Sequence, residues 1–376
     1  MSKRSIFEEV GDKVAVDTPK PVAAEAARVG GRAAVRIWLI VLLALVALMV
    51  IVGGLTRLTD SGLSITEWNV VMGALPPLSQ ADWIAAFDAY KTTDEYKLQN
   101  SWMELADFKP IFWWEWGHRF LGRFLGLVWA VGLIYFAVRK QIPRGWLGRL
   151  ILIGALGGLQ GAVGWWMVYS GLSDRVDVAP YRLATHLGIA FVIFAFISWY
   201  ILKIGREEWE LLQARRRRIS GLFGLSIAVT TLLFLQILLG ALVAGNDAGL
   251  MFLDWPLMHG DVFPADAFEL TPFWANFFEN VGLVQFMHRI TAYALMALAI
   301  YFLIRTRRSG HERTAFWGLA LSLGILLQAG WGVLTLVHAA PMFLALVHQL
   351  AALGLLWLAM RVKFEIAYPS EQKITA

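Results

Sequence analysis

The chain has 376 residues, of which 58% are hydrophobic and only 16% are charged. A soluble domain is typically about 45–50% apolar and about 25% charged, so this composition excludes an ordinary soluble enzyme and a disordered chain. The chain contains no cysteine, which excludes disulfides, iron–sulfur clusters and thiol nucleophiles. Any bound metal must therefore be held by His, Met, Asp or Glu.

Eight segments are apolar over enough residues to cross a hydrocarbon core of about 30 Å as a helix. The sequence therefore predicts an all-α polytopic membrane protein. The spans are expected near residues 37–56, 118–138, 150–170, 182–202, 220–244, 283–304, 314–338 and 341–360.

The distribution of charge predicts the orientation of these spans. Lys and Arg gather in the N-terminal tail, in the loops after the second, fourth and sixth spans, and in the C-terminal tail. Between Asn246 and Gln285, on the opposite side, there is no Lys or Arg but there are six acidic residues. Because basic loops stay on the cytoplasmic side, both termini are expected in the cytoplasm of a bacterial cell, with the chain in its inner membrane. The basic runs are explained by topology, so no binding of nucleic acid is expected.

The eight spans are internally duplicated as two sets of four. Residues 53–68 match residues 240–255 at an offset of 187, and residues 115–119 match residues 285–289 at an offset of 170. Leu159-Gln160 matches Leu327-Gln328 at an offset of 168. Because four is an even number, both halves have the same orientation. This predicts two tandem four-helix bundles related by a pseudo-two-fold axis along the membrane normal.

The duplication also predicts how the chain is divided. An N-terminal half contains a long outer loop, residues 57–117, which is a candidate lid. The expected segments are a cytoplasmic tail (1–36), the N-terminal half (37–205), a basic cytoplasmic linker (206–219), the C-terminal half (220–362) and a cytoplasmic tail (363–376).

Four histidines lie near the starts of the second, fourth, sixth and eighth spans, all of which run inward from the outer face. They are His118, His186, His288 and His348. Each half contributes one pair at a similar depth, and paired imidazoles on facing helices suit the axial positions of a haem iron. The sequence therefore predicts two haem sites. The alternative is that each histidine only makes a hydrogen bond between helices. The remaining three histidines have no counterparts and are expected not to be ligands.

Polar residues beside these histidines are candidate parts of the sites. Arg119 and Arg289 each follow a histidine directly, and Arg123 lies one turn after Arg119. Because Arg pairs well with carboxylates, all three are predicted to hold haem propionates, the alternative being charges at helix ends. Gln160 and Gln328 fall in mid-membrane and either bond between helices or line a pocket.

One difference between the halves predicts where chemistry occurs. Glu115 lies three residues before His118, whereas the matching position before His288 is Gln285, which cannot ionise. A carboxylate beside a haem can accept protons or stabilise a developing cation. This favours chemistry in the N-terminal half and an electron-transfer or structural haem in the C-terminal half. The alternative is a carboxylate that only stabilises the N-terminus of its helix.

Together these motifs resemble the haem A synthase family, in the cysteine-free branch found in proteobacteria and mitochondria. The resemblance covers residues from about 37 to 360. The motifs that carry it are Glu115-Trp-Gly-His118-Arg119, Thr185-His186-Leu187, Gln285-Phe-Met-His288-Arg289 and His348-Gln349.

The resemblance implies oxidation of the C8 methyl of haem O to a formyl group by successive hydroxylation. It implies haem O as substrate between His118 and His186, haem b between His288 and His348, and Glu115 as the functional carboxylate. Expected partners are haem O synthase, a membrane electron acceptor or donor and the assembly of terminal oxidases, with homo-oligomers left open. Other members carry a cysteine pair in the first outer loop, which this chain lacks, so no role for those thiols is carried over.

Two other functions compete with this interpretation. A dihaem b-type electron-transfer cytochrome, linked to quinol, accounts for the four histidines equally well but not for the difference between Glu115 and Gln285. A transporter with histidines along its pathway predicts that no haem is bound.

Overall fold

The computed structural model describes residues 23–69, 72–173 and 175–371, and eight of its helices are long and apolar enough to span a membrane. This confirms the predicted all-α membrane fold. In the described residues the only extended pairing is one isolated bridge between Met258 and Asp261. The spanning helices are α1 (Ala23–Leu58), α4 (Leu105–Val138), α5 (Leu147–Gly171), α6 (Pro180–Ile204), α8 (Ser220–Gly245), α10 (Val281–Arg307), α11 (Glu312–Val337) and α12 (Met342–Ala367).

Both end helices are longer than predicted. Helix α1 begins at Ala23, inside the segment predicted as a polar tail, because residues 23–34 are rich in alanine, the strongest helix former. Residues 1–22 of that predicted tail lie outside the described residues. Helix α12 continues to Ala367, inside the predicted C-terminal tail, and residues 372–376 of that tail are likewise not described.

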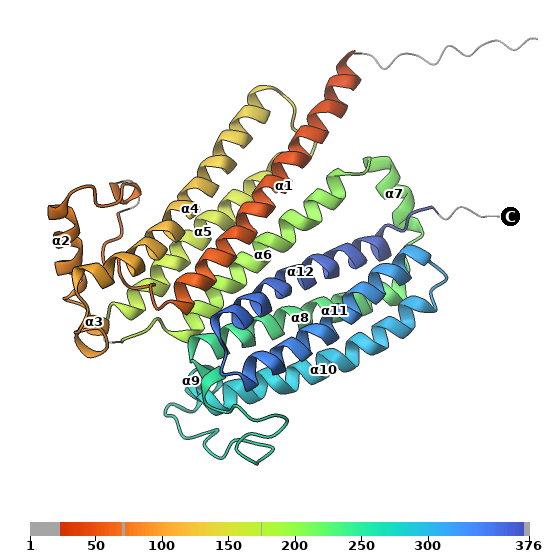
Figure 1. The fold of residues 1–376 in the computed structure, drawn as a ribbon. Coiled ribbons are helices and arrows are strands. Elements are labelled where there is room, and N and C mark those ends of the chain that lie inside the picture. The colour runs from red at the N-terminus through yellow and green to blue at the C-terminus, as the bar shows by residue number, and fades with distance from the viewer. Residues whose placement is uncertain (1–22, 70–71, 174, 372–376) are drawn as a thin grey trace, which may run out of the picture.

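Helix α4 begins thirteen residues before His118, at Leu105, so the prediction that it opens near His118 was wrong. Its outer turns are stabilised by the long outer loop, which contains α2 (Gln80–Tyr90) and α3 (Asp94–Leu98). Phe108 and Phe112 of α4 are buried against Phe87 and Tyr90 of α2. The first turns of α4 bury their apolar face against the loop and do not need contact with lipid. Hydropathy alone therefore did not predict this extension. Figure 1 shows α4 extending beside α2 and α3 at one end of the molecule.

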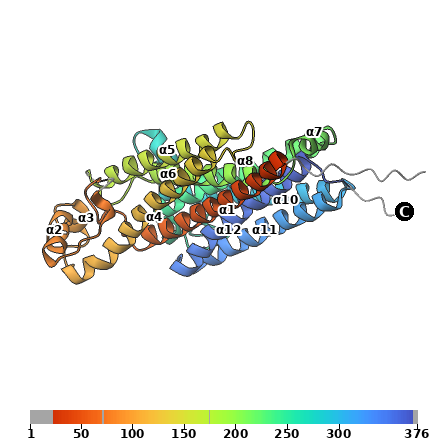
Figure 2. The ribbon, with the colours of Figure 1, turned by 90° about the horizontal axis from the view of Figure 1, so that it is seen from above.

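The neighbours of each helix repeat between the halves. Helix α1 packs against α4 and α6, as α8 packs against α10 and α12. In Figure 1, helices α4 and α5 lie on one side of the molecule and α10 and α11 on the other, with the remaining four spans between them. Seen from above, α5 and α6 lie on the side away from α11 and α12 (Figure 2). One large apolar core joins the spans, and its most deeply buried side chains include Phe191, Ile197, Phe302 and Leu356.

Two tryptophans attach α4 to its neighbours by packing against glycine. The Nε1 of Trp38 on α1 donates to the carbonyl of Val128, and a Cβ at Gly132 would lie 2.2 Å from that nitrogen. The Nε1 of Trp129 donates to the carbonyl of Leu150 on α5 at 3.0 Å. A Cβ at Gly154 would lie only 1.9 Å from Cζ2 of Trp129. Both indoles therefore depend on a glycine that lets the backbones approach.

Gly154→Ala is expected to destabilise the protein, because its methyl group needs the space that Trp129 fills. The expected loss is about 1–3 kcal/mol, as for other overpacked cores, measured as a lower melting temperature in detergent. The matched control is Gly158→Ala on the same helix, where a Cβ meets nothing within 4 Å. Equal melting temperatures for the two variants would contradict this account of the packing.

Candidate haem sites

The structure brings the four predicted histidines together as two pairs. His118 of α4 lies within electrostatic range of His186 of α6, and His288 of α10 lies within range of His348 of α12. All four side chains are only partly buried, although they lie well inside their helices. Each half thus contains two imidazoles on facing helices, as predicted.

Every one of these imidazoles lies against a glycine of a neighbouring helix. A Cβ built at the glycine would lie 2.8–3.1 Å from the Cε1 atom of the ring, which is closer than side chains normally approach. The contact repeats four times at duplicated positions, so a side chain at any of the four glycines would displace the ring from its present place. The four pairs are Gly53–His118, Gly164–His186, Gly240–His288 and Gly332–His348. Glycines at matching places in both halves were visible in the sequence, but their role was not predicted.

Three mid-membrane glutamines bond to the histidines from neighbouring helices. The Nε2 of Gln160 lies 3.2 Å from Nε2 of His186, and that of Gln328 donates to the carbonyl of His348 at 2.7 Å. The amide of Gln236 lies 3.0 Å from Nδ1 of His288 and also donates to its carbonyl. The choice left open for Gln160 and Gln328 is therefore decided in favour of bonds between helices. Gln236 was missed, because its counterpart in the first half is Met49 and the duplication gave no signal.

The donor set fits haem. Several buried polar atoms have no hydrogen-bond partner among the described residues: Nδ1 of His118, His186 and His348, and Oε1 of Gln160, Gln236 and Gln328. Buried polar groups are normally satisfied, so orphaned ring nitrogens between apolar helices are the kind of donor that an iron centre uses. In the same part of the chain, no three His, Asp or Glu side chains come together to hold a bare metal ion. Two facing imidazoles therefore suit a haem better than a zinc ion, which needs three or four protein ligands.

Glu115 is buried one turn before His118, and hydrogen bonds hold both of its carboxylate oxygens. Its Oε2 accepts hydrogen bonds from the hydroxyl of Ser64 and the backbone N–H of Ile65, both at 2.8 Å. Its Oε1 accepts from Nε of Arg119 at 3.0 Å. The carboxylate therefore joins the outer loop to the arginine that follows the histidine.

Gln285 makes the same connection in the C-terminal half without a charge. Its Nε2 donates to the carbonyl of Ala248 at 2.7 Å, and its Oε1 accepts from Arg289 at 2.9 Å. Arg289 also donates to the carbonyls of Phe252 and Leu257. Both residues thus connect a loop to the arginine that follows the histidine, but Glu115 accepts hydrogen bonds from its loop whereas Gln285 donates to its loop. The two halves therefore differ in charge and in the direction of these hydrogen bonds.

The arginines predicted to bind propionates are engaged by the outer loops. Arg119 donates to the carbonyls of Ile65 and Glu67, and Arg123 donates to the carbonyl of Asn69. The buried Nε of Arg289 has no partner among the described residues and is open to a carboxylate. Propionate binding stays a prediction for all three.

Gln349 links the two histidine pairs across the halves. Its Nε2 donates to the carbonyl of Val50 on α1 at 2.8 Å, and its amide fills the space above Gly54, where a Cβ would lie 2.5 Å from Oε1. Gln349 directly follows His348, and Gly54 directly follows Gly53, which lies against the ring of His118. At the matching position of the first half the residue is Leu187, which cannot form such a hydrogen bond.

The comparisons with known proteins agree with this geometry. Residues 36–360 match the COX15-CtaA family model, described as cytochrome oxidase assembly protein. The chain belongs to this family of cytochrome oxidase assembly proteins. A protein of Ruegeria pomeroyi named "Heme A synthase" is 56% identical over 371 residues, which is 98% of each chain. One of Paracoccus denitrificans with the same name is 49% identical over 376 residues, covering 100% of this chain and 99% of the relative.

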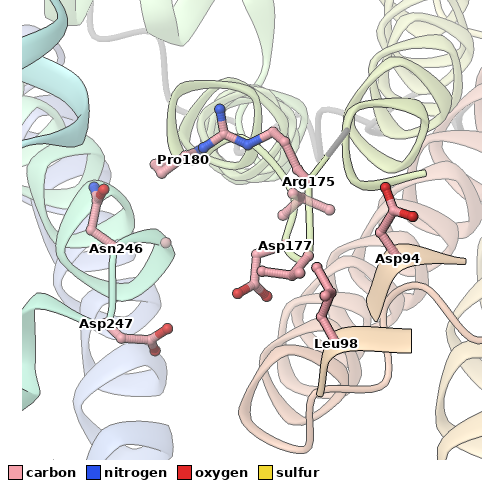
Figure 3. Close-up of a pocket in the computed structure, with 10 residues that line it drawn as sticks. Asp94, Leu98, Arg175, Asp177, Pro180, Asn246 and Asp247 are labelled. Atoms are coloured by element: carbon pink, nitrogen blue, oxygen red, sulfur yellow. The ribbon is translucent and has the colours of Figure 1, made fainter. Parts of the chain in front are cut away.

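The two halves are also joined by an ion pair. Arg57 at the end of α1 forms ion pairs with Asp60 at 2.9 Å and with Asp247 of the second half at 2.8 Å. Beside it lies a cavity of about 550 Å³, lined by Asn246 and Asp247 from one side and by α3 from the other (Figure 3). This cavity lies away from the histidines and contributes no ligand to them.

A buried carboxyl group lies within the outer loop. Glu95 of α3 is 4% exposed, and its Oε2 has no hydrogen-bond partner among the described residues. Burial, followed by repulsion from the carboxylates of Asp177, Glu115 and Asp60, raises the pKa of Glu95 to about 8. The folded loop therefore favours the protonated side chain.

The raised pKa of Glu95 predicts a loop that weakens as the pH rises. An unfolded Glu has a pKa of about 4.3, so between roughly pH 4.3 and 8 the folded state binds a proton that the unfolded state has lost. Stability is therefore greatest below this window and falls through it, by at most about 1.4 kcal/mol per pH unit. Limited proteolysis of the outer loop at pH 5 and pH 8 measures the change.

Glu95→Gln should flatten this dependence, because the amide does not titrate. The matched control is Asp88→Asn in α2, whose side chain is 59% exposed and should leave the slope unchanged. The same slope in wild type and Glu95→Gln would rule Glu95 out as its source.

Proposed function

We propose that this chain is a haem A synthase, an oxidoreductase that converts the C8 methyl group of haem O into a formyl group by successive hydroxylation. The observation that carries the proposal is the duplicated histidine pair, beside which Glu115 of the first half carries a charge that Gln285 of the second half lacks. The name shared by relatives at 49–56% identity over almost the whole chain supports it. A dihaem electron-transfer cytochrome would have no need of that difference.

In this proposal His118 and His186 hold haem O as substrate, and His288 and His348 hold a resident haem b. When bound, the haems supply the redox chemistry, while the protein orients them and sets their surroundings. The second site has the tighter set of contacts, because Gln236 touches both the ring and the backbone of His288. Met49 at the matching place in the first half forms no such bond, which suits a site that must release its occupant.

Glu115 is the proposed source of electrostatic stabilisation. Its two oxygens accept from Ser64, Ile65 and Arg119, so the negative charge is fixed one turn from His118. A preorganised charge stabilises positive charge that develops on a nearby substrate. The same contacts occupy the oxygens that would otherwise accept a proton, so this role is favoured over that of a general base.

The remaining assignments follow from charge and duplication. We propose two tandem four-helix bundles related by a pseudo-two-fold axis, in the bacterial inner membrane, with both termini in the cytoplasm. Haem O synthase, a membrane electron acceptor and the terminal oxidase under assembly are the proposed partners.

The function is tested by co-expressing the protein with a source of haem O and separating the extracted haems by chromatography. Wild type should accumulate haem A, and His118→Ala should abolish it while haem b remains. His348→Ala should instead remove haem b, because it breaks the other pair. A red protein that yields no haem A from haem O would favour the dihaem cytochrome.

Glu115→Gln is expected to slow the formation of haem A about 10²–10³-fold, the range for removing one preorganised electrostatic contact. The fold should persist, since the amide oxygen can still accept from Arg119, as that of Gln285 accepts from Arg289. Ser64→Ala is the matched control, because it removes a hydrogen bond to Glu115 and keeps the charge. Formation of haem A at the wild-type rate by Glu115→Gln would show that the charge plays no part.

A further inference from the structure

The first histidine pair has an arginine beside it that the second pair lacks. Arg182 lies on α6 four residues before His186, so the two side chains share one face of the helix, one turn apart. His186 corresponds to His348 at an offset of 162, and at the same offset Arg182 corresponds to Leu344. The additional guanidinium therefore belongs to the half in which haem O is the proposed substrate.

Arg182 is held in place but keeps one buried donor free. Its Nη1 donates to the carbonyl of Trp166 on α5 at 2.7 Å, and its guanidinium lies over the ring of Trp166, 4.6 Å from the ring centroid. Its Nε is buried and has no hydrogen-bond partner among the described residues. None of the ion pairs in that part of the chain includes Arg182. Buried polar groups are normally satisfied, so this donor is open to an anion.

The tryptophan under Arg182 changes together with it between the halves. At the offset of 168 that relates α5 to α11, Trp166 corresponds to Leu334. The stacked pair Trp166–Arg182 of the first half is thus replaced by Leu334 and Leu344 in the second. An indole stabilises a guanidinium that lies over its face, so the two residues form one unit that only the first half contains.

Glu115 explains why the first half needs a different arginine. In the second half, the arginine with a free buried Nε is Arg289, which directly follows its histidine. In the first half, the matching Arg119 donates from its Nε to Glu115 at 3.0 Å and is therefore committed to that carboxylate. The free buried Nε of the first half is that of Arg182 instead.

The chemistry of haem O supplies the matching anion. The C8 methyl of a haem shares a pyrrole ring with one of the propionates, so a propionate held in place also determines where this methyl lies. Oxidation of one ring methyl among several requires the substrate to be bound in one orientation. A resident haem that only transfers electrons has no such requirement, which fits the presence of the arginine in one half alone.

We propose that Arg182 binds a propionate of haem O and thereby orients the C8 methyl in the His118–His186 site. The guanidinium edge formed by Nε and Nη2 is suited to a carboxylate with two parallel hydrogen bonds, while Nη1 keeps its bond to Trp166. This inference rests on the proposed function and adds the group of the substrate that the first site recognises.

The test compares haem O with its dimethyl ester, which keeps the ring and the hydrocarbon side chain but has no carboxylate. The full-length protein, carrying haem b in lipid nanodiscs, is titrated with each compound by absorbance, under conditions in which chromatography detects no haem A. Wild type should bind haem O roughly tenfold to a hundredfold more tightly than the ester. Arg182→Leu installs the residue of the second half and should weaken binding of haem O by about this factor, while binding of the ester and the haem b content stay unchanged.

The matched control is Arg175→Leu, which removes a positive charge from the loop just before α6. Arg175 pairs with Glu279 at 3.6 Å, so this variant should keep the wild-type preference for haem O over the ester. If Arg182→Leu does not accumulate, Arg182→Lys keeps the charge without the planar fork and should lose part of the preference.

The outcomes separate this proposal from the function itself. A wild type that makes no haem A from haem O overturns the proposed function. A wild type that makes haem A but binds haem O and the ester equally tightly overturns the role of Arg182, whatever the variants do. Equal weakening of both compounds in Arg182→Leu would also overturn it, because only a contact with the carboxylate distinguishes the acid from the ester.

Discussion

The close approach of each imidazole to a glycine backbone is the constraint on which the rest of the structure depends. A ring that lies against a neighbouring helix requires that helix to carry no side chain there, and it sets the distance between the two axes. The four contacts join α1 to α4, α5 to α6, α8 to α10, and α11 to α12. Once these four helix pairs are fixed, the neighbouring helices lie close enough to form the glutamine hydrogen bonds and the apolar core.

Duplication of this arrangement allows the halves to differ without a change of fold. Glu115 and Gln285 each connect a loop to the arginine that follows the histidine, so one site carries a charge that the other lacks while this connection is kept. Gln349 forms a hydrogen bond to α1 of the other half, whereas Leu187 at the matching position cannot.

The outer loop of the first half is part of the site. Its helices support the extension of α4, and its backbone receives the bonds of Arg119 and Arg123. Because the loop holds Glu115 through Ser64 and Ile65, any movement of the loop reaches the carboxylate beside His118. The buried Glu95 makes the stability of the same loop sensitive to pH.

Much of this protein was determined by sequence alone. Long apolar runs can be satisfied in a membrane only as helices, so hydropathy yielded the eight spans, and the repeated motifs paired His118 with His186 and His288 with His348. Helix packing decided what local pattern cannot express. It brought Gln236 and Gln349 to the sites from other helices, placed Glu115 in an ion pair instead of against an open cavity, and extended α4 beyond the membrane. It also decided that Gly154 lies against Trp129, because what surrounds a glycine depends on the neighbouring helix.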